Sequence, residues 1–481
     1  MQLPCSYDVH RNAERRHHRR DVHHARRPGC GAAKWKLASK PQAIARLALT
    51  FALVGVFACN GRGDAGPPIA ITHTSVIDVR TGDVRKDFTV LIRGDRIAYV
   101  GPAKSAPTFD GARVVDGAGK FLIPGLWDMH VHGFLYVFSD FAGPLMIANG
   151  VTGARDMGYY IDTTLRWKRD IAAGKVIGPR LVTGVRVDGP VNKARFIAHA
   201  TTAEDGARAV DTLARKKDGK PRADFIDIEN RLPRAAYFAL AREASKIGVA
   251  FAGVVPESVS VVEASAAGQR SLEHEDDLMR ACRNRSGSTC DSVIRTLARN
   301  NTAVTPTLVK YQPLAHMFDS ASTHPDWAKY VPGLVKGGWI NRASNVAKGD
   351  SMSVRNYFSF DRTRQLHSAG VKLLAGTDTP QPFVFPGFSL HDELGLLVRA
   401  GLTPLEALQT ATINPAEFFG MQGALGTVEQ GKVADLVLLN ANPLENIANT
   451  KRIAAVIANG RLFDRAALNA LLQHVETALK R

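Results

Sequence analysis

Apolar and polar residues alternate near both ends of the chain, in the pattern of half-buried β-strands. The clearest runs are residues 74–79, 89–92 and 96–100 near the start, and 434–439 and 453–458 near the end. We therefore expect one β-sandwich built from residues 66–122 and 420–465, with a C-terminal helix at 466–481.

The middle of the chain, residues 123–419, has a different pattern. Short apolar runs alternate there with helical stretches such as 233–246 and 403–412, which is typical of βαβ units and a parallel sheet. Eight such units favour an α/β fold of the TIM-like (β/α)₈-barrel kind, with its chemistry at the C-terminal ends of the strands. The eight expected strands are residues 126–132, 150–156, 180–185, 223–229, 248–255, 270–274, 303–309 and 371–377.

The formal charge of +17 is concentrated near the N-terminus. Residues 1–59 hold eleven Lys or Arg against three acidic residues, so +8 of the charge lies there and the body is moderately basic. This distribution argues against a nucleic-acid partner. The basic stretch lacks apolar periodicity, and we expect it to be disordered.

An uncharged run of twelve residues, 47–58, follows the last basic residue of this segment, Arg46, and is followed by Cys59. It is too short to span a bilayer but has the length of the apolar part of a signal peptide. The end of the run resembles a bacterial lipoprotein signal, in which the cysteine is lipidated, although Phe57 fits that pattern poorly and ordinary signal cleavage stays open. We expect an exported protein, periplasmic or anchored to the outer membrane, whose only membrane contact is the lipid anchor.

Two cysteines remain in the body, Cys282 and Cys290. In an oxidising compartment we expect them to form a disulfide that pins a surface loop between them. A zinc site is not expected there, because no further soft ligand lies nearby.

The residues with most potential for chemistry are His130 and His132, at the end of the first expected barrel strand. Side chains two positions apart on a strand face the same way, so both imidazoles are expected at the barrel mouth. The pattern favours a metal site over a pair of surface histidines.

Five runs in order along the chain resemble motifs of the amidohydrolase superfamily, most closely its imidazolonepropionase-like branch, which includes Xaa-Pro dipeptidases. The resemblance extends from about residue 70 to 463. The runs are FLIPGLWDMHVH at 121–132, GVTGARD at 150–156, SLEH at 271–274, AGTD at 375–378 and GTVEQGKVADL at 426–436.

The resemblance implies a metal centre that is only partly present in this chain. In the family the two histidines and the aspartate, here His130, His132 and Asp378, hold one divalent metal. A carboxylated lysine on the fourth strand bridges to a second metal, which histidines of the fifth and sixth strands complete. His274 matches the sixth-strand ligand, but Asp227 stands in place of the lysine and Val254 in place of the fifth-strand histidine.

Asp227 is a weak candidate, because a carboxylated lysine reaches farther from the backbone by on the order of 5 Å. We therefore expect one divalent metal per chain, most simply zinc, and no second metal. The metal would lower the pKa of a bound water. Asp378 would then accept the proton of that water, and His274 would either polarise the substrate carbonyl or be a buried core histidine.

These features predict a metal-dependent hydrolase acting on a C–N bond of a small molecule, such as a dipeptide or a cyclic amide, other than an ordinary internal peptide bond. The alternative is a catalytically inactive barrel that serves as a binding or scaffolding lipoprotein. The sequence leaves the substrate open, and also whether the chain forms a homo-oligomer. Arg155 and Arg180 could bind a substrate carboxylate or tie loops together, and the run at 391–393 fits a helix N-terminus.

Overall fold

The computed structural model describes most of the chain after residue 65. The expected leader and the candidate lipidation residue Cys59 lie outside the described residues. The described ranges are 66–108, 110–133, 139–158, 160–190, 197–214, 222–282, 287–315, 325–349 and 360–480.

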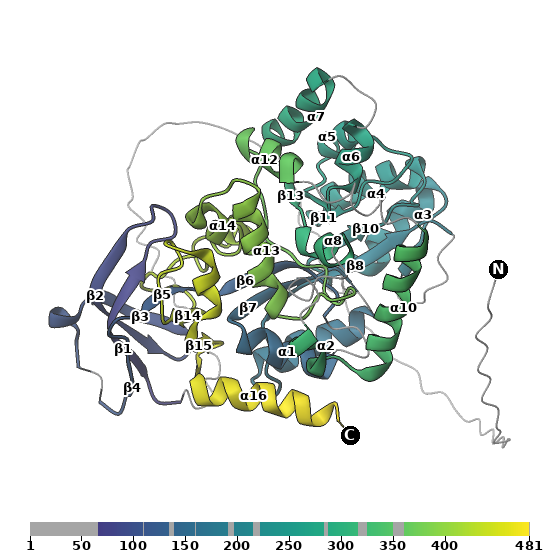
Figure 1. The fold of residues 1–481 in the computed structure, drawn as a ribbon. Coiled ribbons are helices and arrows are strands. Elements are labelled where there is room, and N and C mark those ends of the chain that lie inside the picture. Colours follow the sequence, from purple (N-terminus) through teal and green to yellow (C-terminus); the bar gives the residue numbers. More distant parts are fainter. Residues whose placement is uncertain are drawn as a thin grey trace, which may run out of the picture. The chain divides into compact units, whose positions relative to one another are not determined.

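Strands from the two ends of the chain share one eight-stranded sheet, in which the order is β16-β15-β14-β5-β1-β2-β3 and β4 pairs with β1. The link between the two ends is the antiparallel pairing of β5 with β14, where Leu122 lies opposite Leu438. Figure 1 shows β14 and β15, in yellow, beside the purple N-terminal strands. The strands are β1 (Ile69–Ile77), β2 (Val84–Arg93), β3 (Arg96–Pro102), β4 (Arg113–Asp116), β5 (Phe121–Pro124), β14 (Leu436–Leu439), β15 (Ile453–Ala458) and β16 (Arg461–Asp464).

The second sheet is parallel and forms the barrel, with the order β13-β12-β11-β10-β8-β7-β6. Its strands are β6 (Leu126–Val131), β7 (Val151–Asp156), β8 (Arg180–Asp188), β10 (Phe225–Ile228), β11 (Ala250–Gly253), β12 (Ser271–Glu273) and β13 (Ala303–Thr305), and β9 (Ile197–His199) pairs with β8. These strands are almost wholly buried, as expected for a parallel sheet covered by helices.

The eighth expected strand, residues 371–377, closes the barrel without being a continuous strand. Parallel bridges join Leu373 to Val304 of β13 and Thr379 to Val131 of β6. The Asp378 amide donates to the His130 carbonyl at 2.7 Å, which completes the ring of strands. The predicted (β/α)₈-barrel with a β-sandwich domain is thus confirmed.

Helices follow the barrel strands, and two of them begin or end at residues that favour helix termini. For α14 (Pro404–Thr410), Thr403 and Glu406 form a capping box. For α4 (Arg234–Ile247), Gly248 ends the helix with a positive φ of 70°.

The other α-helices of the described residues are α1 (Ser139–Ala148), α2 (Ile161–Ala172), α3 (Ala203–Ala209), α5 (Val261–Ala266), α6 (Asp276–Cys282), α7 (Gly287–Arg299), α8 (Leu308–Ala315), α10 (Gly333–Gly349), α12 (Phe360–Ser368), α13 (Phe388–Arg399), α15 (Ile413–Phe418) and α16 (Arg465–Ala478). Among the described residues, no helix combines the length and the apolar character needed to cross a bilayer.

The predicted disulfide between Cys282 and Cys290 is present. The sequence led us to expect a loop between them, but α7 already begins at Gly287, so part of this segment is helical. The disulfide therefore ties the end of α6 to the first turn of α7.

Candidate metal centre

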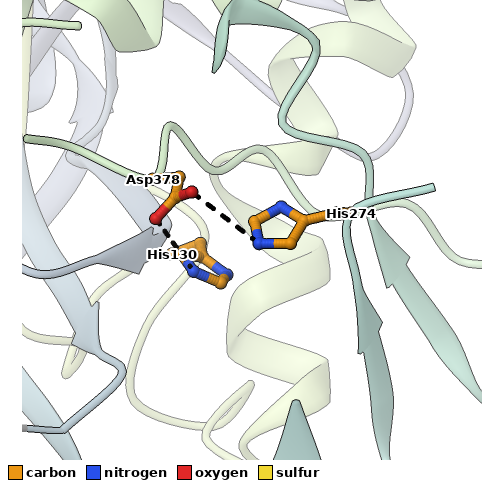
Figure 2. A group of neighbouring side chains, drawn as sticks. All are labelled: His130, His274 and Asp378. Carbon is orange, nitrogen blue, oxygen red and sulfur yellow. Dashed lines mark ion pairs between the residues drawn. The ribbon is translucent and has the colours of Figure 1, made fainter. Parts of the chain in front are cut away.

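Four of the predicted site residues meet at the C-terminal end of the barrel. His130 lies in β6, His132 directly after it, His274 directly after β12, and Asp378 in the eighth barrel segment. The Nε2 atoms of His130 and His132 lie 3.4 and 3.2 Å from Asp378 Oδ1. His274 Nε2 lies 3.7 Å from Asp378 Oδ2, so His130 and His274 approach different oxygens of one carboxylate (Figure 2).

The backbone turns sharply where His274 and Asp378 leave their strands. Their φ angles are 67° and 61°, in the left-handed region that non-glycine residues seldom adopt. Such a conformation costs on the order of 1 kcal/mol or more, and it persists only where the surrounding structure enforces it. Gly376 is required beside this turn, because a Cβ there would lie 2.9 Å from the His130 amide nitrogen.

A buried charge network holds the His130 ring from behind. Its Nδ1 lies 2.8 Å from Glu273 Oε2, and Arg155 Nη2 donates to Glu273 Oε1 at 2.6 Å. Arg155 is fully buried and also donates to Ser271 Oγ and to the Met129 carbonyl. Arg155 therefore neither binds a substrate carboxylate nor ties loops together; it fixes Glu273, which orients His130.

His274 is held on both ring nitrogens, and one of its partners was missed in the sequence. A lysine ammonium can only donate, so His274 Nε2 accepts from Lys310 Nζ at 3.2 Å, which assigns the ring proton to Nδ1. The Nδ1 N–H then donates to Thr307 Oγ1 at 2.6 Å, and the Thr307 hydroxyl is within reach of the Pro306 carbonyl as its own acceptor. Lys310 also lies 2.8 Å from Asp378 Oδ2.

Burial and charge act against each other at these side chains. Burial disfavours the charged form of His130, but the carboxylates of Asp378 and Glu273 outweigh it and raise its pKa to about 9. Burial lowers the pKa of His132 to about 4. Burial also opposes ionisation of Asp378, but the charges of Lys310 and His130 hold its pKa well below the ordinary value. The centre is therefore built around the ionised carboxylate of Asp378, with a second ionised carboxylate, that of Glu273, behind the His130 ring.

Asp227, at the position of the family's bridging lysine, is engaged outside the centre. Asp227 Oδ2 accepts from Arg186 Nε at 3.1 Å, and Arg186 also pairs with Glu229. Within the described chain, the trio of side chains whose metal-binding atoms come within 4.8 Å of one another is His130, His274 and Asp378, and neither His132 nor Asp227 is part of it.

The donor set fits one divalent metal. His130 has its Nδ1 fixed by a carboxylate and its Nε2 towards Asp378, an arrangement that is common for metal-binding histidines. The buried Nδ1 of His132 has no hydrogen-bond partner in the described part of the chain, whereas most buried side-chain nitrogens in protein cores are hydrogen-bonded. Two imidazoles and one carboxylate also match catalytic zinc sites.

Other candidates lie apart from this centre. Arg180 donates to Asp435 at 3.1 Å and so joins the barrel to the β-domain, which is the loop-tying role. His391 is buried in α13 between Thr450 and the Asn149 carbonyl. Helix α13 begins three residues before it, as expected, although its N-cap is Gly387.

The Amidohydrolase family matches residues 121–463, most of the chain. Among relatives, adenine deaminase 3 of Rhizobium meliloti is 24% identical over 79% of this chain, which spans 56% of that relative's length. An imidazolonepropionase of Symbiobacterium thermophilum is 26% identical over 80% of this chain and 93% of its own.

A solved structure shows the same fold. A Xaa-Pro dipeptidase with bound methionine in its active site superposes with a TM-score of 0.63, at 20% identity, over 82% of this chain and 100% of the other. At this identity the similarity concerns the arrangement of the barrel and its flanking sheet.

Proposed function

Since the chain belongs to the amidohydrolase family, we propose that it is a hydrolase of a C–N bond in a small molecule and works with one divalent metal. His130, His132 and Asp378 would hold the ion, and zinc suits this donor set. When bound, such an ion supplies a Lewis acid that makes water nucleophilic near neutral pH.

The chain's own residues account for the proton movements. Asp378 is the ionised carboxylate at the centre, so it is the group to accept the proton of the attacking water. The same carboxyl would then deliver that proton to the leaving nitrogen. Glu273 and Arg155 keep the His130 ring in place throughout, because neither of them reaches solvent.

The observation that carries the proposal is the convergence of three imidazole Nε2 atoms on the single carboxylate of Asp378. Structural core histidines have no reason to collect around one acid at the C-terminal end of a barrel, where barrel enzymes place their chemistry.

A metal-free binding protein is the second candidate, and one contact favours it. Lys310 Nζ lies 2.8 Å from Asp378 Oδ2 and so already supplies a positive charge next to the carboxylate. A chain that had lost its metal could balance the buried acid in this way.

Turnover separates the two candidates. The purified chain is incubated with panels of dipeptides, N-acyl amino acids and cyclic amides, before and after metal removal with a chelator and readdition of Zn²⁺. We expect turnover that disappears with the metal and returns with Zn²⁺, that is lost in His130→Ala and that is kept in His367→Ala, a part-exposed histidine paired with Glu406. A metal-loaded chain that turns over none of the panel would count against the hydrolase.

A further inference from the structure

Lys310 contacts His274, the residue that the resemblance assigns to a second metal. It lies in the first turn of α8, and its Nζ bridges Asp378 Oδ2 at 2.8 Å and His274 Nε2 at 3.2 Å. His274 and Asp378 come from different barrel strands, as Figure 2 shows, so Lys310 joins the sixth and eighth strands through its amino group.

His274 cannot act as the hydrogen-bond donor to a substrate carbonyl from this position. Its Nδ1 proton is used on Thr307, and its Nε2 has only a lone pair, which accepts from Lys310. A nitrogen with a lone pair repels a carbonyl oxygen. His274 therefore does not polarise the substrate carbonyl, the first of the two roles expected for it from the sequence.

Lys310 has the donor that His274 lacks. An ammonium carries three N–H groups, and the described residues take two of them, at Asp378 and His274. Among the described residues no acceptor takes the third, and the Lys310 side chain is 18% exposed, so part of it is accessible from solvent.

The position of Lys310 is fixed by the helix that carries it. Glu393 Oε2, in α13, accepts from the Val309 amide at 2.8 Å and so holds the first turn of α8. Next to Lys310, Tyr311 donates its hydroxyl to Asp276. An anchored cation of this kind needs little reorganisation during a reaction.

The remaining second-metal positions are also closed to a metal. Arg186 occupies the carboxylates of Asp227 and Glu229, and Val254 offers no lone pair. Two basic side chains, Arg186 and Lys310, thus supply the positive charge that a second ion would bring.

We propose that Lys310 is a catalytic residue that takes the place of the second metal, with its third N–H donating to the carbonyl oxygen of the bound substrate. This role rests on the proposed hydrolase function and adds to it a one-metal, one-lysine centre. As the carbonyl carbon is attacked, the new C–O bond forms and the carbonyl π electrons move to the oxygen, whose negative charge the Lys310 N–H stabilises. When the C–N bond breaks, those electrons re-form the carbonyl, and the electron pair of the C–N bond leaves with the nitrogen, which takes the proton held by Asp378.

The test combines zinc counting with kinetics in the full chain and in Lys310→Ala. The proposal predicts one zinc per chain in both proteins. It also predicts that kcat of the variant falls by about 100-fold or more while KM changes little, the usual effect of losing one donor to a developing oxyanion. Added methylammonium or ethylammonium should restore part of the kcat of Lys310→Ala, which a purely structural lysine would not allow. Lys372→Ala is the matched control, because Lys372 is ion-paired with Glu417 outside the centre.

The outcomes separate this inference from the proposed function. No zinc and no turnover in the wild-type chain would overturn the hydrolase and this role with it. Two zinc ions per wild-type chain would overturn the inference alone, since His274 would then be a metal ligand. So would a Lys310→Ala variant with wild-type kcat, which would make Lys310 only a partner of Asp378 in the metal-free protein.

A second variant covers the case in which Lys310→Ala is unstable. Lys310→Gln, which keeps an N–H donor, should fold and retain more activity than the alanine variant. Equal or lower activity would count against the proposal.

Discussion

Glu273→Gln tests how the centre is held from within the barrel. The carboxylate of Glu273 is buried and accepts hydrogen bonds from Arg155 at 2.6 Å, from Ser271 at 2.5 Å and from His130 at 2.8 Å. The variant keeps the shape of the side chain but removes its negative charge. The Arg155 guanidinium then remains buried without a counter-charge.

The magnitude follows from that uncompensated charge. Removing one partner of a buried ion pair costs about 3 to 5 kcal/mol in the free energy of unfolding. Urea unfolding of the metal-free protein, followed by circular dichroism, measures this loss. The control is Glu417→Gln, whose partner Lys372 is at the surface, and we expect it to change the free energy by less than about 1 kcal/mol.

The same change should also weaken metal binding. Arg155 and Ser271 both donate towards Oε1, so the amide oxygen of the glutamine takes that place and its NH₂ faces His130 Nδ1. His130 must then accept at Nδ1 and carry its proton on Nε2, the nitrogen that faces Asp378. Loss of such an orienting carboxylate lowers metal affinity about 10- to 100-fold. A variant with unchanged stability and unchanged zinc affinity by calorimetry would refute this view of Glu273.

Three further predictions concern the scaffold. Burial raises the pKa of Glu393 from 4.5 to about 8, so between these pH values the folded protein keeps a proton that the unfolded chain releases. The free energy of unfolding of the wild type should therefore fall by about 5 kcal/mol as the pH rises to 8, and Glu393→Gln should not show this fall in urea titrations at several pH values. Cys282→Ser should lower the free energy of unfolding by about 2.5 kcal/mol, because the Cys282–Cys290 disulfide closes a short loop, and the wild type should match it once a reductant is present. Gly253→Ala should lower the free energy of unfolding by about 2 to 3 kcal/mol, because φ is 122° and a Cβ would lie 2.4 Å from a carbonyl oxygen of β10. Gly248→Ala, with open space around it, should lower it by only about 1 kcal/mol, and equal losses of the two variants in thermal unfolding would contradict this reasoning.

The fold class could be predicted from the sequence because each barrel strand is buried on both faces and appears as a short apolar run, and the family could be predicted from the five motif runs. Seven of the eight expected strands are continuous strands, and the eighth, at 371–377, is a bridged segment that turns at Asp378. The short strand β9 was not predicted, since three residues, Ile197–His199, are too few for a pattern.

The candidate ligands could be found because they belong to local runs, such as the two histidines that are two positions apart. Lys310 could not be found in this way. It follows His274 by 36 residues and lies on a helix, and only the closure of the barrel brings its amino group to that ring. For Arg155 the residue type alone fits several roles, and its burial behind Glu273 decides among them.

The proposed ligands His130, His132 and Asp378 would hold one metal ion. Elemental analysis of the purified chain, grown with added Zn²⁺, and of the His130→Ala variant measures whether they do. We expect about one equivalent of divalent metal in the wild type and a loss of most of it in the variant. Wild-type protein that carries no metal, or a variant that keeps its full metal content, would overturn the metal centre.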